Sequence, residues 1–253
     1  MTARRHPAGA AARGIIRAGQ ADIDVLSQVI ADAFFPLAPC QWLIPDQAAR
    51  REIFPGYFRM YVEHAMADGL VHTTSARDAA ALWIPTGPQL PGPPDGYHEH
   101  LAQITGPWAE RFAVFDAELD DHHLTGLEHH HLAILAVRPD RQGQGTGTAL
   151  LDAHHAVLDQ EGTVAYLEAS DERTRRIYLR HGYVDYSAPI ELPPSSLLHG
   201  DHGAPGQQAG RVRMYPMVRT PKPHPRVTRR QAPGACPDQP NGAHHGGRGR
   251  EPA

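Results

Sequence analysis

The sequence predicts an α/β protein of the α+β type, with a mixed sheet that carries helices on both faces. In the second half of the chain, apolar runs typical of strands alternate with stretches in which apolar residues recur every three or four positions. Strands are expected at residues 129–137, 163–170, 183–187 and 211–219, and helices at 148–160 and 171–182. This order, with short connections, favours one sheet covered by helices.

The first half of the chain predicts a helical layer and a hairpin. Residues 21–35 carry apolar side chains at helical spacing. Residues 46–69 predict more helix, interrupted near Pro55 because proline breaks the helical hydrogen-bond pattern. Strands at 70–75 and 79–85 flank a short turn and are expected to pair.

Composition confines the folded part to the middle of the chain. The 253 residues are 41% hydrophobic, which is ordinary for a globular protein. Residues 220–253 are rich in Pro, Gly and Arg and have almost no large apolar side chains, so burial cannot offset the entropy of ordering them. We therefore expect disordered tails at 1–13 and 220–253 around one domain at 14–219.

The charge distribution argues against a nucleic-acid partner. The two tails hold nine of the 24 basic residues and two of the 28 acidic residues, which leaves 15 basic against 26 acidic residues at 14–219. Such a body repels nucleic acid and attracts cations. For the basic tail, an inert solvated extension is favoured over a nucleic-acid-binding one.

The number of cysteines and the hydropathy of the chain indicate in which cellular compartment the protein is expected. Cys40 and Cys236 are the only cysteines, so no disulfide framework is indicated, which favours the reducing cytoplasm. No apolar stretch approaches the roughly 20 residues that a membrane helix needs, and the first residues have no hydrophobic signal region. We expect no membrane partner.

A glycine-rich turn connects the strand at 129–137 to the next helix. Small residues before a helix leave backbone N–H groups unpaired at the positive end of the helix dipole, which suits an anion such as phosphate. The turn lacks the Lys of a Walker motif and the last Gly of a dinucleotide motif. It matches Gln/Arg-x-x-Gly-x-Gly/Ala through Gln142, Gly145 and Gly147. A plain strand-to-helix connection is the alternative.

With its flanking segments, this turn resembles the pyrophosphate-binding motif of the GNAT superfamily of acetyl-CoA-dependent N-acetyltransferases. The shared segments are AVRPDRQGQGTG, AYLEAS, RIYLRHGY and a final Met-x-Arg at 217–219. Within the family, the chain is similar to the puromycin-type small-molecule acetyltransferases. The resemblance covers about residues 14–219, most firmly 129–186, and implies the GNAT fold, with a mostly antiparallel sheet of six to seven strands.

The resemblance also implies that acetyl-CoA is the cosubstrate. Backbone N–H groups of the turn would hold its pyrophosphate, and the preceding strand would pair with its pantetheine arm and polarise the thioester carbonyl near Leu135. Members of the family commonly have Asn where this chain has Thr174, so a hydroxyl would have to replace that amide. The predicted cofactor-binding residues are Leu135, Ala136, Val137, Gln142, Gly143, Gln144, Gly145, Thr146, Gly147, Thr148 and Thr174.

Tyr178 is the predicted proton donor to the leaving thiolate. It matches the family segment whose tyrosine lies beside the sulfur, and an ordinary phenol is protonated at neutral pH. A packing tyrosine is the alternative. Candidate bases for the amine proton are, in order, Glu168, His130 and His131, although each could instead be structural or solvated.

Histidine pairs raise the question of a metal, and none is expected. His129 and His131 share a strand face but provide only two ligands, while His154 and His155 are adjacent on a helix and cannot both face one ion. No His-Glu-x-x-His motif is present.

These assignments predict transfer of an acetyl group to a primary amine of a small molecule, by direct attack in a ternary complex, in a monomer or homodimer. Two alternatives remain open. One is a protein acetyltransferase acting on lysines or N-termini, for which an acidic docking face is equally suitable. The other is a non-catalytic module that binds acyl-CoA.

Overall fold

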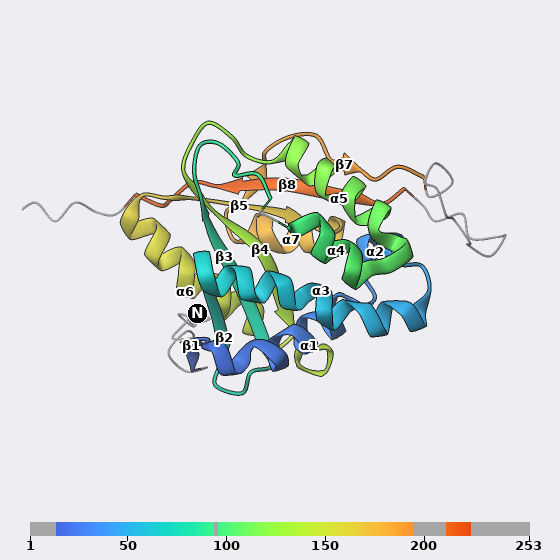
Figure 1. Ribbon diagram of the computed structural model, residues 1–253. Helices are drawn as coiled ribbons and strands as arrows, with labels where there is room; N and C mark the ends of the chain where they lie inside the picture. Colours follow the sequence, from blue (N-terminus) through green and yellow to red (C-terminus); the bar gives the residue numbers. More distant parts are fainter. Residues whose placement is uncertain (1–13, 94–95, 195–210, 224–253) are drawn as a thin grey trace, which may run out of the picture. The chain divides into compact units, whose positions relative to one another are not determined.

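A mixed sheet between two layers of helices forms the centre of the computed structural model (Figure 1). The structure describes residues 14–93, 96–194 and 211–223. The tail predicted at 1–13 and nearly all of the tail predicted at 220–253 therefore lie outside the described residues. Segment 195–210, inside the predicted domain, also lies outside them.

The described strands pair in the order β1-β2-β3-β4-β5-β8-β6, with β7 also paired to β8. Only β4 and β5 run parallel; the other pairs are antiparallel. The mostly antiparallel mixed sheet is thus confirmed, with one strand more than predicted because two-residue β7 has no detectable pattern. The strands are β1 Ile15–Arg17, β2 Leu70–Thr74, β3 Ala79–Thr86, β4 His129–Val137, β5 Val164–Ala169, β6 Val184–Asp185, β7 Ile190–Glu191 and β8 Arg213–Arg219.

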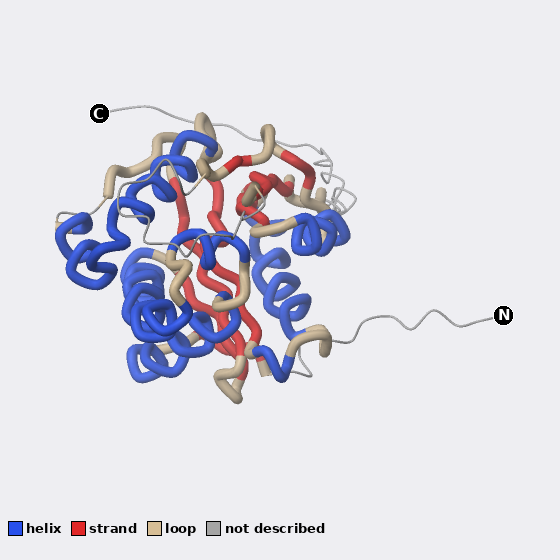
Figure 2. The backbone as a smooth tube through the Cα atoms, turned by 90° about the vertical axis from the view of Figure 1, so that its right-hand side faces the viewer, coloured by secondary structure: helices blue, strands red, loops and turns tan. Residues whose placement is uncertain are grey.

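Helices cover both faces of the sheet, as predicted (Figure 2). On one face lie α1 Ile23–Phe34, α2 Ala38–Leu43, α3 Gln47–Asp68, α4 Tyr97–Thr105 and α5 Ala109–His122. On the other face lie α6 Thr146–Glu161 and α7 Glu172–Arg180. Among the described residues, no helix is both long and apolar enough to cross a bilayer.

Helix α3 corrects one prediction, because it runs through Pro55 without a break. Phe54, Tyr57 and Phe58 surround this position, and each is at most 3% exposed. Their rings pack against one another at centroid distances of 5.1 to 6.3 Å. Burial of three aromatic side chains outweighs a proline penalty of about 3 kcal/mol, so tertiary packing keeps the helix continuous.

A β-bulge in β4 sets which side chains face which layer. Leu82 pairs with Ile134 and Trp83 with Leu132, so Ala133 is an extra residue on β4. Leu132 packs with the α6 layer, whereas Ile134 packs with the α1 and α3 layer. Residues two apart on an unbroken strand would share a face, so the bulge reverses the alternation in the second half of β4.

Candidate active site

The two parallel strands at the centre of the sheet separate after a short paired stretch. β4 pairs with β5 only where His129, His130 and His131 meet residues 164–166. Further along, β5 continues to pair with β8, and β4 with β3. The backbone edge of β4 beyond His131, which includes the predicted residues Leu135, Ala136 and Val137, therefore has no strand partner on the β5 side in the described sheet. Such an edge can pair with an extended ligand.

The predicted glycine turn follows the open edge directly. Gly143 and Gly145 have φ angles of 74° and 79°, in the left-handed region that glycine adopts without strain. Gly145 is the N-cap of α6, and no side chain caps this helix end. The first N–H groups of a helix have no acceptor within the helix, so those of Thr146, Gly147 and Thr148 are available to a ligand.

These features fit the diphosphate that the family resemblance implies. Unpaired N–H groups at the positive end of α6 suit an anion, and the open edge of β4 leads to them. The Gln142 side chain donates to the Val137 carbonyl at 3.1 Å and so ties the turn to the end of β4. The Gln144 side chain donates to the Asp140 carbonyl at 3.5 Å. The assignment of these residues to a cofactor stays a prediction.

Thr174 has a structural role that the sequence did not indicate. Its hydroxyl donates to Asp171 at the start of α7, and the Asp171 carboxylate accepts from the Thr174 N–H at 2.6 Å. The two residues form a capping box. Since the hydroxyl is engaged in this cap, a cofactor contact from Thr174 would have to compete with it.

Tyr178 lies on α7 and packs, partly buried, against the cluster that contains Leu132 and Tyr183. Its ring meets the Tyr183 ring edge-on at 5.6 Å. Burial raises the pKa of Tyr178, and the charge of Asp171 raises it further. The raised pKa keeps the phenol protonated. Its hydroxyl has no hydrogen-bond partner among the described residues, so it is able to donate to a ligand.

Glu168 and His131, two of the predicted bases, are in direct contact. His131 on β4 and Glu168 on β5 meet across the point where the strands separate, with Nε2 and Oε2 2.9 Å apart. The Glu168 side chain is 6% exposed and that of His131 19%. Burial alone would raise the pKa of Glu168, but the charge and hydrogen bond of His131 and the proximity of His123 outweigh it and hold that pKa below its ordinary value.

The third predicted base, His130, lies elsewhere. Strand alternation turns it to the opposite face of the sheet, where its Nδ1 contacts Nε2 of His154 on α6 at 2.9 Å. His154 in turn stacks on Trp83 at a centroid distance of 4.3 Å. Burial lowers the pKa of His130 and that of His154, the latter to about 3. The structure therefore does not bring His130 to the Glu168–His131 pair.

His123 is the residue of this site that sequence reasoning missed. It follows the C-terminus of α5 and places Nδ1 3.5 Å from Oε1 of Glu168. Its Nε2 lies 3.1 Å from Nε2 of His129, whose Nδ1 meets the Leu127 carbonyl. It stands outside the strand pattern, so only the abundance of histidine nearby could have indicated it.

Aromatic and acidic side chains from α3, α4 and α5 lie in the region next to Glu168. The Tyr97 hydroxyl donates to Asp116 at 2.9 Å, and Tyr61 is influenced by the charges of both Asp116 and Glu168. Burial raises the pKa of Asp116 to about 6, although the Tyr97 hydrogen bond opposes that shift. The site therefore has a negative electrostatic character.

Together these features define a class of protein. An open strand edge that leads to an anion-binding turn suits an extended ligand ending in phosphates, and a buried carboxylate–histidine pair beside it suits proton transfer. These are the features that a group-transfer enzyme with a phosphate-bearing cosubstrate requires.

Comparison with known families identifies this class more closely. Residues 109–185 match the model of the acetyltransferase (GNAT) domain. This match places a GNAT acetyltransferase domain at those residues, which confirms the predicted family for that part of the chain.

Individual relatives are similar over parts of the chain or in fold alone. Mycothiol acetyltransferase of Propionibacterium freudenreichii subsp. shermanii is 38% identical over 74 residues, which are 28% of this chain. The chain thus spans about a quarter of the length of that curated relative, 24%.

Two solved structures share the fold. An acetyltransferase of Corynebacterium glutamicum, described as histone acetyltransferase HPA2 and related acetyltransferase, has 22% identity and a TM-score of 0.55, covering 85% of this chain and 99% of its own. Arylalkylamine N-acetyltransferase 2 of Aedes aegypti has 12% identity and a TM-score of 0.54, covering 81% of this chain and 97% of its own.

Proposed function

We propose that this protein transfers an acetyl group from acetyl-CoA to the primary amine of a small molecule, by direct attack in a ternary complex. The observation that carries the proposal is the gap between β4 and β5, with the anion-binding turn at its wide end and the Glu168–His131 pair where it closes. Acetyl-CoA would supply the acetyl group as a reactive thioester. Residues 135–137 and 142–148 would bind and orient it.

His131, oriented by Glu168, is the proposed acceptor of the amine proton. Because an ionised Glu168 carboxylate only accepts, His131 Nε2 must donate to it. The neutral ring then carries its lone pair on Nδ1, which has no hydrogen-bond partner among the described residues. A histidine held in one tautomer by a carboxylate is a suitable general base near neutral pH.

Tyr178 is the proposed proton donor to the sulfur. It belongs to the α6 and α7 layer, whereas His131 and Glu168 contact His123 at the end of α5, in the opposite layer. The amine proton and the thiol proton would thus be handled on opposite sides of the gap. Its raised pKa keeps the phenol protonated until the sulfur leaves.

A direct attack is favoured over an acetylated enzyme cysteine. In the described part of the chain, Cys40 is the sole cysteine, and it is buried in the α1 and α3 layer. Burial raises the pKa of its thiol to about 12. A thiol that stays protonated at neutral pH is a poor nucleophile.

A cationic small amine is the proposed acceptor. The acidic balance of residues 14–219 and the Asp116 region beside Glu168 both attract positive charge. The curated relative named for mycothiol acts on a small molecule, which supports the same substrate class here.

Release of coenzyme A thiol from acetyl-CoA tests the proposal. With a panel of small amines, lysine peptides and N-terminal peptides, we expect amine-dependent thiol release that is fastest with one class of small cationic amine. Fastest release with peptides would make it a protein acetyltransferase. Binding of acetyl-CoA without release with any acceptor would make it a binding module.

A conservative variant tests the proton acceptor. Glu168→Gln keeps the shape but removes the charge that fixes the His131 tautomer, so we expect kcat with the best amine to fall about 10²-fold or more, with rescue at high pH where more of the amine is neutral. Glu161→Gln, at the exposed end of α6, is the matched control and should leave kcat unchanged. A Glu168→Gln enzyme with the wild-type pH–rate profile would remove this role.

A further inference from the structure

We propose that His123, His131 and Glu168 form a binding site for a divalent metal ion of the zinc type. Acetyl transfer does not require this ion, and the site does not depend on the function proposed above. The ion would replace the proton that His131 Nε2 donates to Glu168, so the metal-bound form and the form that accepts the amine proton are alternative states of the same side chains. Zinc accepts imidazole nitrogen and carboxylate oxygen, and a His₂Glu set is one of the combinations that proteins use for it.

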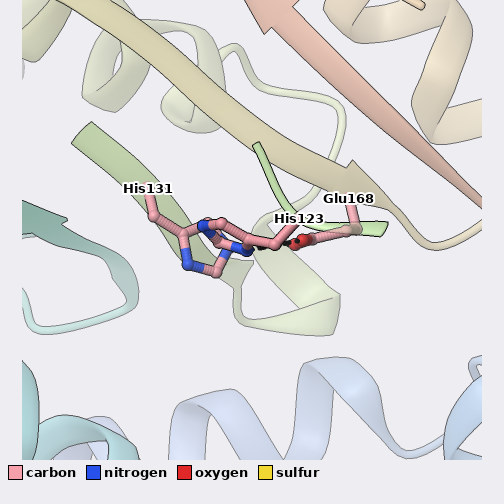
Figure 3. A group of neighbouring side chains, drawn as sticks. All are labelled: His123, His131 and Glu168. Carbon is pink, nitrogen blue, oxygen red and sulfur yellow. Dashed lines mark hydrogen bonds and ion pairs between the residues drawn. The ribbon is translucent and has the colours of Figure 1, made fainter. Parts of the chain in front are cut away.

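The three side chains converge from separate elements. Figure 3 shows His131 from β4, Glu168 from β5 and His123 from the segment after α5 pointing toward one another. One ligand atom from each lies within 4.8 Å of the others. Two ligands about 2.0–2.1 Å from a tetrahedral zinc ion are about 3.3 Å apart. His131 Nε2 lies 2.9 Å from Oε2 of Glu168 and His123 Nδ1 lies 3.5 Å from Oε1, so each nitrogen is near that distance from one oxygen of the same carboxylate.

Hydrogen bonding fixes the tautomer of His123 and points its lone pair at Glu168. A carbonyl only accepts, so His129 Nδ1 must donate to Leu127. In neutral His129, Nε2 then accepts from His123 Nε2. Neutral His123 is left with its lone pair on Nδ1, facing Glu168 Oε1 at 3.5 Å.

Two lone pairs facing each other in a buried site are unfavourable. Within the described residues, Oε1 of Glu168 makes no hydrogen bond. A cation between Nδ1 and Oε1 would satisfy both atoms, while the His129 contact would serve as the outer-shell hydrogen bond that metal-bound histidines usually make.

A second group of potential ligands is less suited to a cation, because positively charged side chains lie beside it. Asp152, His155 and His181 also bring ligand atoms within 4.8 Å. They line a cavity of about 510 Å³ together with Arg219 and Lys222, whose positive charges oppose a bound cation. At Glu168, by contrast, the groups that lower the pKa are histidines and not Arg or Lys. A further carboxylate, that of Asp120, lies near His123.

Cobalt(II) is the probe, because a His- and carboxylate-bound ion gives visible absorption where zinc gives none. Titrating the full chain with Co²⁺ should produce one saturable visible band that Zn²⁺ displaces. His123→Gln and Glu168→Gln should each weaken Co²⁺ binding at least tenfold. Zn²⁺ should raise the melting temperature of the wild-type protein but not of these variants, whose own melting curves report whether they fold.

Two controls address other histidines. His244→Ala/His245→Ala removes an adjacent pair in the tail, and His181→Gln removes one member of the second group; both should retain the band. The proposal is overturned if the band persists in both His123→Gln and Glu168→Gln, if either control removes it, or if the wild-type chain gives none. In that last case a proton on His123 Nδ1 satisfies the carboxylate.

This test is separate from the test of acetyl transfer. The band and the melting shift need neither acetyl-CoA nor an amine, so a chain without transferase activity could still bind the metal. The earlier expectation of no metal rested on the pairs His129/His131 and His154/His155, neither of which includes His123.

Discussion

His131 and Tyr178 divide the proposed proton transfers between two faces of one sheet. His131 is held by a buried carboxylate at 2.9 Å, and Tyr178 by packing alone. A histidine that acts as a general base must be held in the tautomer whose lone pair faces the substrate. A phenol that acts as an acid needs only to stay protonated and close to the sulfur. The different ways in which the two side chains are held suit these different tasks.

Removing the Tyr178 hydroxyl should affect turnover and not folding. Because the hydroxyl makes no hydrogen bond to a described residue, Tyr178→Phe loses no internal partner, and we expect an unchanged melting temperature with kcat reduced about 10²-fold or more. Steady-state kinetics and thermal melting together measure this. Tyr215→Phe, a tyrosine packed on the same cluster, is the control and should keep wild-type kcat. Wild-type turnover in Tyr178→Phe would contradict the assignment.

The sequence could name Glu168 and Tyr178 because they lie in segments shared with the family, and His131 because it begins the strand that leads into the turn. It could not choose between His130 and His131. Alternation places them on opposite faces, but the sequence does not say which face Glu168 shares. Nor could it find His123, because that residue reaches the site only through the packing of α5 on the sheet.

At the scale of elements, the glycine turn and the bulge in β4 position the site. The turn was predictable because glycines are typical of left-handed backbone before a helix, and because the spacing of Gln142, Gly145 and Gly147 matches the family motif. The bulge at Ala133 was not, because an alanine carries no signal for an extra residue in a strand. Continuity of α3 through Pro55 was also unpredictable, since the aromatic packing that maintains it is tertiary.

A matched pair of glycines tests the turn. Gly143 and Gly162 have φ angles of 74° and 73°, and a Cβ at either would meet nothing within 4 Å. Alanine at either position should therefore cost a similar 1–2 kcal/mol of stability, approximately, through backbone strain alone. We expect Gly143→Ala to weaken coenzyme A binding at least tenfold and Gly162→Ala, at the far end of α6, to leave it unchanged.

Calorimetry and urea unfolding on both variants make this comparison. Equal coenzyme A affinity in Gly143→Ala and Gly162→Ala would show that the turn is a plain connection.

At the scale of the whole molecule, buried histidines couple the fold to pH. Burial lowers the pKa of His129 to about 4 and those of His154 and His155 to about 3. Each folded pKa lies below the unfolded value of about 6.5, so the unfolded state binds more protons between those values. The stability is fully present above about pH 6.5 and is lost as pH falls toward 3.

Acid should therefore destabilise this protein steeply. We expect the free energy of unfolding to fall by about 1.4 kcal/mol per pH unit for each such histidine below pH 6.5. Urea unfolding from pH 7.5 to 5 measures it. Repeating the series at high salt separates this desolvation effect from general charge repulsion, which salt screens. A midpoint that does not change between pH 7.5 and 5 would refute the prediction.

The sheet as a whole was largely predictable, because the strands predicted at 70–75, 79–85, 129–137, 163–170, 183–187 and 211–219 are all present. The separation of β4 from β5 was not predictable. Both strands remain regular and apolar past His131, and only their pairing to β3 and β8 shows that they part. That separation is the feature on which the proposed function depends.

The central claim is that the turn before α6 binds the diphosphate of coenzyme A and so positions the thioester in the gap between β4 and β5. Calorimetry with coenzyme A and with pantetheine, which has the same arm without the diphosphate, tests it most directly. We predict that coenzyme A binds at one site per chain and that pantetheine binds at least 100-fold more weakly. Equal affinity for the two ligands, or no binding of coenzyme A, would contradict the account.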